Sequence, residues 1–374
     1  MKMIIMLHER ICKSSPSFRK AVELDTKKRR PSLLDVARQS GVSSATASRV
    51  LNGTVPVRED VRLRVLNAVA NLGYEHSPHR SARNALTNAV ALLIPDILNP
   101  FFAEIVRGVQ DESADEFMPL LLDIAEDAQR EHQYFRLLTT LPVCGVIVCG
   151  SRIAAEELVA AVEKQKTPIV VLNRVVRRPN VACLMVDFQS ATYRAIGHLL
   201  DLNHTRIAYL AGPPQSHASQ ARQRGIETAL REAKLTLPNE LCPVSFPNVD
   251  GGFQSMSALL ALPPAQRPTA VIAYNDLMAM GALHAIRAYH LCVPEDISVI
   301  GIDDLAMAAH TNPPLTTIAQ PKYRMGRLAL KTLRRMIQGQ PPPEEGYTLL
   351  ESPLIVREST ALARTSNGNN GSHR

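Results

Sequence analysis

The sequence is poor in aromatic residues, and its cysteines form no closely spaced pairs. Phe, Tyr and Trp make up only 4% of the 374 residues, and Trp is absent. This argues against proteins that bind single strands by stacking bases on aromatic rings. The six cysteines include no Cys-x-x-Cys pair, so we expect neither a zinc site nor a disulfide scaffold. We expect no metal and no cofactor.

Long apolar runs are also missing. No stretch approaches the ~20 apolar residues that a membrane span requires. Residues 1–7 are apolar, but charged residues follow them at once, without the anatomy of a signal peptide. With 45% hydrophobic and 21% charged residues, the composition is that of a globular chain. We expect a soluble, cytoplasmic protein with no membrane partner.

Positive charge is concentrated near the N-terminus. Residues 1–90 hold 16 of the 42 Lys and Arg but only 7 of the 35 Asp and Glu, so their net charge is +9. The other 284 residues have a net charge of −2. This asymmetry favours contact between the N-terminal part and a polyanion. A solvated basic tail is the alternative, and charge alone does not separate the two.

The pattern of the chain divides it into five regions. Residues 1–30 lack sustained periodicity and are expected to form a flexible basic extension, whereas 31–74 read as short helices. Residues 75–88 are polar and irregular, as in a hinge, and the body extends from 89 to 358. The remainder, 359–374, is a polar tail.

In the body, apolar segments alternate with amphipathic ones. Such alternation of strands and helices predicts parallel sheets with helices on both faces. The body is too long for one such sheet, so we expect two doubly wound lobes. The expected strands are 89–94, 119–124, 144–149, 168–172, 182–186, 206–211, 269–273 and 297–301.

The segment from 31 to 74 has the punctuation of a helix-turn-helix. Ser32 and Asp35 have the spacing of a capping box, and Gly41 permits the sharp turn after the first helix. Ser43 is expected to cap the second helix, and Gly73 to end a third over about 59–72. The core is expected to contain Ala47, Val50 and Leu51 of the second helix and Val61, Val65, Leu66, Val69 and Leu72 of the third.

The second helix would expose Ser44, Ala45, Ser48 and Arg49. Small side chains can approach base edges, Ala can contact a thymine methyl, and Arg can donate two hydrogen bonds to guanine. The pattern therefore predicts a recognition helix in the major groove. An αα-hairpin that does not bind DNA, with a solvated Arg49, is the alternative at this point.

The segment Leu33 to Asn52 reads Leu-Leu-Asp-Val-Ala-Arg-Gln-Ser-Gly-Val-Ser-Ser-Ala-Thr-Ala-Ser-Arg-Val-Leu-Asn. It closely resembles the signature of the lactose-repressor (LacI/GalR) family of bacterial transcription regulators. The resemblance continues through Leu72-Gly73-Tyr74 and over the body to about residue 358. It implies a homodimer whose helix-turn-helix domains bind a pseudo-palindromic operator in double-stranded DNA.

The resemblance also implies a body like the periplasmic binding proteins, whose lobes close on a small effector, a sugar or sugar acid. Lobe 1 would comprise about 89–186 and 320–340, and lobe 2 about 187–319 and 341–358. Closure would rotate the lobes, order or release the hinge, and change operator affinity. We expect induction, in which the bound effector releases the protein from its operator.

The resemblance carries over two sets of site residues. Leu86 would be the leucine that wedges into the minor groove, although a buried hinge residue is the alternative. The expected DNA contacts are Leu33, Ser43, Ser44, Ala45, Thr46, Ser48, Arg49, Asn52 and Leu86. The expected effector contacts are Phe101, Phe102, Asn173, Arg222, Asn275, Asp303 and Gln320.

Each effector contact has a structural alternative. Phe101 and Phe102 could simply be buried at a helix start. Asn275-Asp276 and Asp303-Asp304 both follow strands, where ligands bind in open α/β sheets. Within these pairs we expect Asn275 and Asp303 to contact the ligand, and Asp276 and Asp304 to cap helices.

The chain departs from the family pattern at two positions. Arg58 stands where many members have a capping Ser, and Pro247 stands near the place of an aromatic platform in some sugar-binding members. The tail has no leucine heptad, which favours a dimer over a tetramer.

An enzyme is the main alternative class. Some sugar kinases carry a helix-turn-helix, but the chain has no phosphate-cradling Gly-x-x-x-x-Gly-Lys or Gly-x-Gly-x-x-Gly motif. It also lacks the His-Glu-x-x-His and Gly-x-Ser-x-Gly motifs. A sensor that no longer binds DNA is a further alternative. The sequence therefore favours a regulator without catalytic activity.

Overall fold

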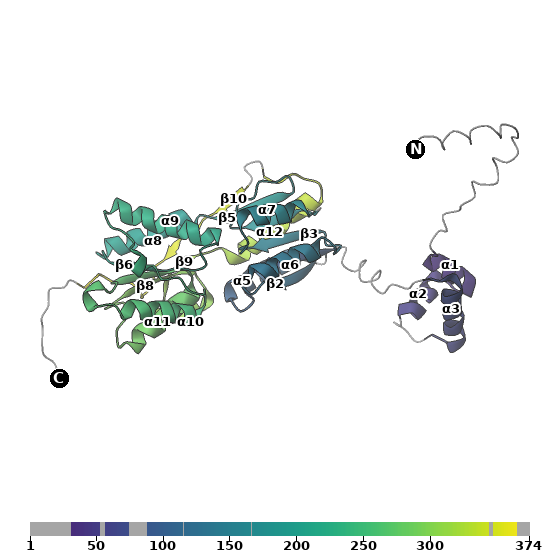
Figure 1. The fold of residues 1–374 in the computed structure, drawn as a ribbon, viewed down its shortest axis with the longest axis horizontal. Coiled ribbons are helices and arrows are strands. Elements are labelled where there is room, and N and C mark those ends of the chain that lie inside the picture. The colour runs from purple at the N-terminus through teal and green to yellow at the C-terminus, as the bar shows by residue number, and fades with distance from the viewer. Residues whose placement is uncertain are drawn as a thin grey trace, which may run out of the picture. The chain divides into compact units, whose positions relative to one another are not determined.

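The computed structural model describes residues 31–52, 57–74, 88–114, 116–165, 167–343 and 347–364. The chain divides into two units, Met1–Ala82 and Arg83–Arg374, and each is described by itself (Figure 1). Within the first unit, the described part holds three helices: α1 (Leu33–Ser40), α2 (Ser44–Asn52) and α3 (Glu59–Leu72).

The expected helix boundaries of the first unit are confirmed. The Ser32 hydroxyl accepts from the Asp35 amide, while the Ser32 amide donates to the Asp35 carboxylate over 2.8 Å, which completes the capping box. Gly41 ends α1 at φ 66° and Gly73 ends α3 at φ 60°. These left-handed conformations are accessible to glycine without strain. Arg58 provides no side-chain cap for α3.

The core of this unit is small. It consists of Val36, Ala37, Ala47, Val65 and Ala68, with partly buried residues such as Leu33 and Val50 packed around it. The expectation that Leu66 belongs to the core is wrong, because its side chain is 43% exposed. Ala68 takes the inward position instead, since the face that meets α1 lies three residues beyond Val65.

The first lobe of the second unit contains a six-stranded sheet in the order β10-β5-β4-β3-β1-β2. Every pairing in this sheet is parallel. Its strands are β1 (Ala89–Ile94), β2 (Met118–Asp123), β3 (Gly145–Cys149), β4 (Ile169–Leu172), β5 (Val181–Val186) and β10 (Tyr347–Leu350). Its helices are α5 (Pro100–Ser113), α6 (Ala128–Leu138), α7 (Ala155–Glu163) and α12 (Lys322–Ile337).

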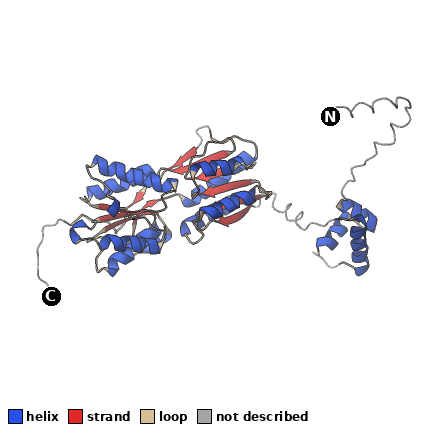
Figure 2. Ribbon diagram, in the orientation of Figure 1, coloured by secondary structure: helices blue, strands red, loops and turns tan. Residues whose placement is uncertain are grey.

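Alternate residues of β1 pack on opposite faces of this sheet. Val90, Leu92 and Ile94 belong to the cluster that includes residues of α5 and α12, and Ala89, Ala91 and Leu93 to the cluster with α6 and α7. A strand that is apolar at every position is therefore buried on both faces. Figure 2 shows helices covering both faces of each sheet.

The second lobe contains a five-stranded sheet in the order β11-β9-β8-β7-β6. Its strands are β6 (Ile207–Leu210), β7 (Ala270–Ala273), β8 (Ser298–Asp303), β9 (Thr316–Ala319) and β11 (Leu354–Ile355). Its helices are α8 (Phe188–Asp201), α9 (His217–Glu232), α10 (Val249–Leu260) and α11 (Asp276–Ala288). Short 3-10 helices are η1 (Asn239–Leu241), η2 (Pro264–Gln266) and η3 (Ala306–His310).

The eight expected strands are present within two residues of their predicted ends. Two expectations about the lobes are wrong. The expectation that 341–358 belongs to lobe 2 holds for β11 but fails for β10, which pairs with β5 of the first sheet, Tyr347 opposite Cys183. The second sheet is not wholly parallel, because β11 runs antiparallel to β9. β10 pairs with β5 at the edge of the first sheet. The chain then reverses direction, so that β11 pairs with β9 in the second sheet.

Helices α5 and α12 approach each other so closely that two glycines are required at their contact. A Cβ on Gly326 would lie 2.1 Å from the Ile105 carbonyl oxygen, and one on Gly108 would lie 2.2 Å from the Tyr323 carbonyl oxygen. Both distances are far below van der Waals contact. The two helices therefore form a rigid pair on the face of the first sheet.

We expect Gly326→Ala to lower the free energy of unfolding by about 2 kcal/mol, because the added methyl forces the two helices apart. Gly197→Ala on α8 is the matched control, since its new Cβ would meet nothing within 4 Å. The control should raise stability by about 0.5 kcal/mol through helix propensity. Urea unfolding measures both variants. Equal changes in the two would contradict a tight α5–α12 contact.

Candidate functional site

The first candidate surface is the exposed side of α2. Ser44, Ala45 and Arg49 are exposed, whereas Thr46 and Ser48 are half-buried. The Ser43 hydroxyl accepts from the Thr46 amide over 3.1 Å and lies 2.8 Å from the Thr46 hydroxyl. Ser43 therefore caps α2 as expected, and the first turn presents small polar groups beside Arg49. The geometry suits a base edge or a phosphate.

The other expected DNA contacts differ from this group. Leu33 is half-buried and packs against the core of the helical unit, so its side chain has a structural role. The side chain of Asn52 and the whole of Leu86 lie outside the described residues. The described part of the unit is only mildly basic, with Arg38, Arg49, Arg58, Arg62 and Arg64 against Asp35, Glu59 and Asp60.

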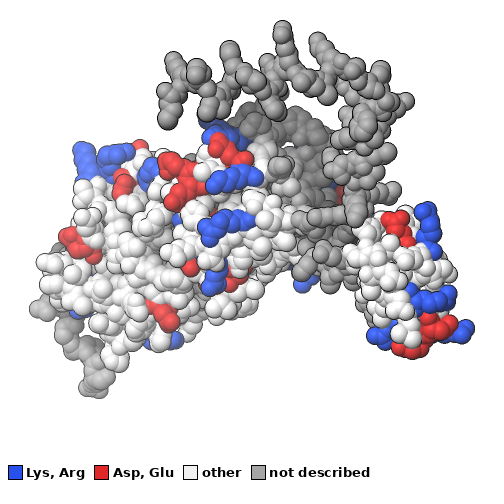
Figure 3. Space-filling view, turned by 45° about the vertical axis from the view of Figure 1, so that its right-hand side comes forward, with Lys and Arg blue, Asp and Glu red and all other residues white. Residues whose placement is uncertain are grey.

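The charges of the body are distributed differently. On the face that Figure 3 shows, Lys and Arg intermingle with Asp and Glu, without a continuous field of one sign. The described residues on this face form no basic stripe of the kind that follows a nucleic-acid backbone.

The second candidate site is a cavity between the two lobes of the body, of about 660 Å³ including its open mouth. Its lining comes from the loops that follow the carboxyl ends of strands in both sheets, where open α/β sheets bind ligands. All seven expected effector contacts line it: Phe101, Phe102, Asn173, Arg222, Asn275, Asp303 and Gln320. The structure thus brings together residues that are more than 200 positions apart.

Arg222 of α9 is held between two aromatic rings. Its guanidinium carbon lies 4.1 Å from the centroid of Phe188 and 4.3 Å from that of Tyr274. The side chain is buried, yet its Nε has no hydrogen-bond partner. Cation–π contacts stabilise the charge and fix the plane of the guanidinium, so the unpartnered N–H is available to a ligand.

Sequence reasoning missed Phe188 and Tyr274. Tyr274 directly follows β7, and Phe188 comes two residues after the end of β5. Both therefore lie at strand ends, as Asn275 and Asp303 do. A place at a strand end is the sequence signal that could have identified both rings, but it was used only for polar side chains. In a sugar-binding site, rings at strand ends are equally informative.

Asp303, at the end of β8, is fully enclosed. Its carboxylate accepts from Gln320 Nε2 over 2.6 Å, and Gln320 Oε1 has no partner. Burial raises the pKa of Asp303 well above its usual range, and neighbouring Asp276 raises it further, while Arg222 and Lys322 oppose the shift. The carboxyl group can therefore act as an acceptor or, when protonated, as a donor.

The expected roles within Asn275-Asp276 are partly wrong. Asn275, not Asp276, caps α11: its Oδ1 accepts from the Met278 amide over 2.8 Å, and its Nδ2 donates to Pro247. Asn275 still lines the cavity. The correction arises because the polar side chain immediately before the helix is the one that reaches its free amides.

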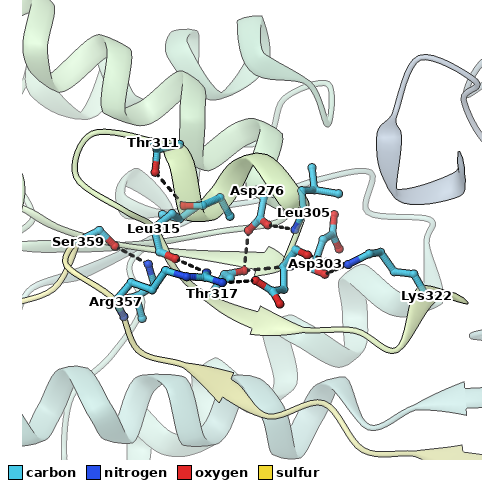
Figure 4. Close-up of polar contacts among 12 residues, drawn as sticks. Asp276, Asp303, Leu305, Thr311, Leu315, Thr317, Lys322, Arg357 and Ser359 are labelled. Atoms are coloured by element: carbon cyan, nitrogen blue, oxygen red, sulfur yellow. Dashed lines mark hydrogen bonds and ion pairs between the residues drawn. The ribbon is translucent and has the colours of Figure 1, made fainter. Parts of the chain in front are cut away.

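Asp276 instead holds the loop that follows β8 through two hydrogen bonds. It is fully buried and accepts from the Thr317 hydroxyl over 2.6 Å and the Leu305 amide over 2.8 Å (Figure 4). Burial raises its pKa to about 6, although these two hydrogen bonds oppose the shift. Asp304 caps no helix either; it forms an ion pair with Arg357 at 2.7 Å.

Phe101 and Phe102 begin α5 behind the cap that Asn99 provides. Their rings meet edge to face with centroids 5.0 Å apart, and both are buried. They belong to the main hydrophobic cluster and also line the cavity. The buried-phenylalanine alternative and the ligand-contact expectation therefore apply to the same two side chains.

The first lobe adds a polar wall that sequence reasoning did not identify. Arg152 is paired with Glu126 through two nitrogens, one of them 2.7 Å from Oε1, and both side chains are buried. The Ser151 hydroxyl beside them is buried without a partner. Asn173 is less free, because its Oδ1 accepts from the Val186 amide. No motif marks Arg152, since its partner lies 26 positions earlier.

Three buried polar atoms in this cavity lack a hydrogen-bond partner: Ser151 Oγ, Arg222 Nε and Gln320 Oε1. Unsatisfied buried polar groups are costly, so their concentration in one cavity indicates a ligand that completes them. Such a ligand needs both donors and acceptors, and an apolar face for the rings.

Two other kinds of site were tested on the part of the chain that the structure describes. It contains no group of three or more His, Cys, Asp or Glu arranged to hold a metal ion. No helix within that part is long and apolar enough to cross a membrane.

Two family models match the chain. Residues 32–77 match "Bacterial regulatory proteins, lacI family", and residues 196–360 match a periplasmic binding protein-like domain. A curated relative, the HTH-type transcriptional repressor CytR of Escherichia coli (strain K12), is 34% identical over 330 residues. The alignment covers 87% of this chain and 95% of the relative.

Solved structures agree with these matches. A complex of the transcriptional regulator CelR with cellobiose is 31% identical, with a TM-score of 0.65, covering 88% of this chain and 100% of that one. The lac repressor dimer bound to operator and the anti-inducer ONPF is 26% identical, with a TM-score of 0.66. That match covers 89% of this chain and all of the other.

Proposed function

Because the chain belongs to the lacI family of bacterial regulatory proteins, it is a DNA-binding transcriptional regulator, and we propose that an effector bound between its lobes switches its affinity for an operator. The observation that carries this proposal is the cavity itself. Ser151 Oγ, Arg222 Nε and Gln320 Oε1 are buried there without partners.

The chemistry of the cavity favours an uncharged, hydroxyl-rich effector. The rings of Phe101, Phe102 and Tyr274 suit the apolar face of a sugar. Three arginines line the cavity. The positive charges of Arg222 and Arg152 already face the carboxyl groups of Asp303 and Glu126, and Arg174 already donates to two backbone carbonyl groups, so little cationic capacity is left for a charged ligand. A neutral sugar or sugar derivative fits better than a sugar acid, in keeping with the cellobiose complex of CelR.

Operator recognition is assigned to α2. Its exposed Ala45 and Arg49 would read base edges in the major groove, with Ser43, Ser44, Thr46 and Ser48 on bases or phosphates. As in the dimeric lac repressor structure, two copies of this chain would place two such helices on the half-sites of a pseudo-palindrome. On the resemblance alone, we assign Asn52 a further DNA contact and Leu86 the insertion into the minor groove.

The switch would operate through the junction of the lobes. Arg174 of the first lobe donates to Ile153 O over 2.6 Å and to Gln215 O of the second lobe over 3.1 Å, so a polar link at the cavity already joins the lobes. Effector binding would add further links and bias one arrangement. A typical coupling of 1–3 kcal/mol would change operator affinity about 5–150-fold. We favour induction, in which the effector releases the operator.

We place the protein in the cytoplasm, because a bacterial transcription regulator acts on the chromosome. We assign it no catalytic reaction. The direct test is selection of bound duplexes from fragmented genomic DNA at about 0.15 M salt. A symmetric pair of half-sites supports the proposal. Sequence-independent binding by a folded dimer would contradict it.

We expect Arg49→Ala to relax base preference at one position in each half-site, because a bidentate contact with guanine contributes about 1–3 kcal/mol of discrimination. Arg62→Ala, on the supporting helix α3, should at most weaken all sequences equally. Binding to a library of single-base operator variants measures both. Unchanged preference in Arg49→Ala would remove the assigned contact.

We expect Asp303→Asn to reduce the affinity for effector at least tenfold, since the amide no longer supplies two acceptor oxygens to the cavity. The probe is the first neutral sugar, from a set that includes cellobiose, that changes operator binding. Asp201→Asn, exposed at the end of α8, is the control. Calorimetric titration measures the affinity, and a normal value for Asp303→Asn would exclude Asp303 from the site.

A further inference from the structure

Lys322 places a buried ammonium group at the junction of the two lobes. It is the first residue of α12, which packs on the first sheet, and it is only 5% exposed. Its Nζ donates to the carbonyl oxygens of Asp303 over 2.8 Å and Asp304 over 2.7 Å, at the end of β8 in the second lobe (Figure 4). Glu104 Oε1 of α5 lies 3.5 Å away. Three acceptors thus surround a group with three donors.

The two carbonyl groups belong to a strained turn. Asp303 has φ 131° and Asp304 has φ 54°, two consecutive non-glycine residues with positive φ. The φ of Asp303 lies in a region that essentially only glycine adopts, so this turn persists only where its surroundings hold it. This backbone turns the Asp303 carboxylate into the cavity while its carbonyl oxygen faces Lys322. Arg357 holds the outer side of the turn through Asp304.

The turn also gathers charge. Asp303 is faced by Asp276 of α11, Arg222 of α9 and Gln320, and Lys322 approaches it from α12. Asp304, paired with Arg357, is the remaining charged neighbour. Two carboxyl groups therefore share a buried space with two cations, of which only Arg222 lines the cavity. Lys322 does not line the cavity, so any effect it has on a ligand passes through Asp303.

We propose that Lys322 is the positioning residue of this site: from the first lobe it holds the strained Asp303–Asp304 turn of the second lobe and supplies the positive charge that lets the Asp303 carboxylate face the effector. The inference rests on the proposed effector function of the cavity. It adds a residue that touches no effector and belongs to the lobe opposite the carboxylate it positions.

The first test compares Lys322→Met with Lys331→Met in the full-length chain. Met removes the charge and the donors but keeps most of the side-chain length, and Lys331 is an exposed lysine on the same helix. In hydrogen exchange followed by mass spectrometry, we expect peptides that cover Asp303 to Leu305 to exchange about tenfold faster in Lys322→Met only. Equal exchange in both variants would overturn the proposal.

The second test uses pH, because loss of packing alone has no reason to follow the titration of a carboxyl group. Burial raises the pKa of Asp276 to about 6 and that of Asp303 well above its usual range, and Lys322 opposes both shifts. Groups with raised folded pKa values contribute stability below the unfolded pKa of about 3.9 that is lost as pH rises through the folded pKa. Without Lys322 the pKa values of Asp276 and Asp303 in the folded chain rise further. The loss of stability with rising pH therefore extends to higher pH.

Lys322→Met should therefore unfold only slightly earlier than Lys331→Met at pH 5, which lies below the pKa of about 6 that burial gives Asp276. At pH 8 the melting temperatures of the two variants should lie further apart. The gap should widen by about 3 °C for each tenfold increase in the proton affinity of the two carboxyl groups that the loss of Lys322 causes. A gap that is constant from pH 5 to pH 8 would contradict the assignment.

Two milder substitutions keep the test decisive if Lys322→Met does not fold. Lys322→Arg retains the charge and should follow the pH profile of the parent chain, whereas Lys322→Gln retains donors without charge and should show the widening gap. Identical profiles for Arg and Gln would overturn the proposal. These measurements involve neither DNA nor effector, so their outcome is independent of whether an operator or an effector is found.

Discussion

The body of this regulator depends on the burial of opposite charges where its two lobes meet. Asp276 and Asp303 are removed from water at the carboxyl ends of the second sheet, and burial raises the pKa of both. Such groups are tolerated only where cations and hydrogen bonds oppose the loss of hydration. Arg222 supplies this from within the second lobe and Lys322 from the first. The same groups that make burial possible therefore tie the lobes together and form the floor of the cavity.

The connections between the lobes place this charge cluster on a shared boundary. The chain passes from β5 to α8, from β9 to α12 and from β10 to β11, and each passage leaves one sheet for the other. Gln320 and Lys322 lie on the second passage, next to the end of β8. A ligand that binds Asp303 and Gln320 thus contacts the very segment through which the lobes are joined. Tight packing of α12 on α5 at Gly108 and Gly326 would carry a change at Lys322 into the first lobe as a whole.

Much of the fold could be predicted from local pattern, and the exceptions have physical causes. The apolar runs gave eight strands because buried parallel strands are apolar on both faces. Strands β9, β10 and β11 escaped prediction because Thr316-Thr317 and Tyr347-Thr348 are polar and β11 has two residues. In the helix-turn-helix, Ser32, Gly41, Ser43 and Gly73 act locally and were assigned correctly. Leu66 was misplaced because α3 has apolar residues on more than one face, with Leu63 and Leu66 exposed, and this leaves its inward face ambiguous.

The sequence by itself determined the class of protein, since the helix-turn-helix signature is local, and its resemblance to the lactose-repressor family singled out the seven residues that line the cavity. The tertiary structure alone decided what those residues do. Only across the sheets does Arg222 meet Phe188 and Tyr274, Glu126 meet Arg152, and Lys322 meet the carbonyl groups of Asp303 and Asp304. Partners that lie 18 to 52 positions apart leave no periodic signal, because burial and pairing of charge depend on the three-dimensional neighbourhood and not on spacing along the chain.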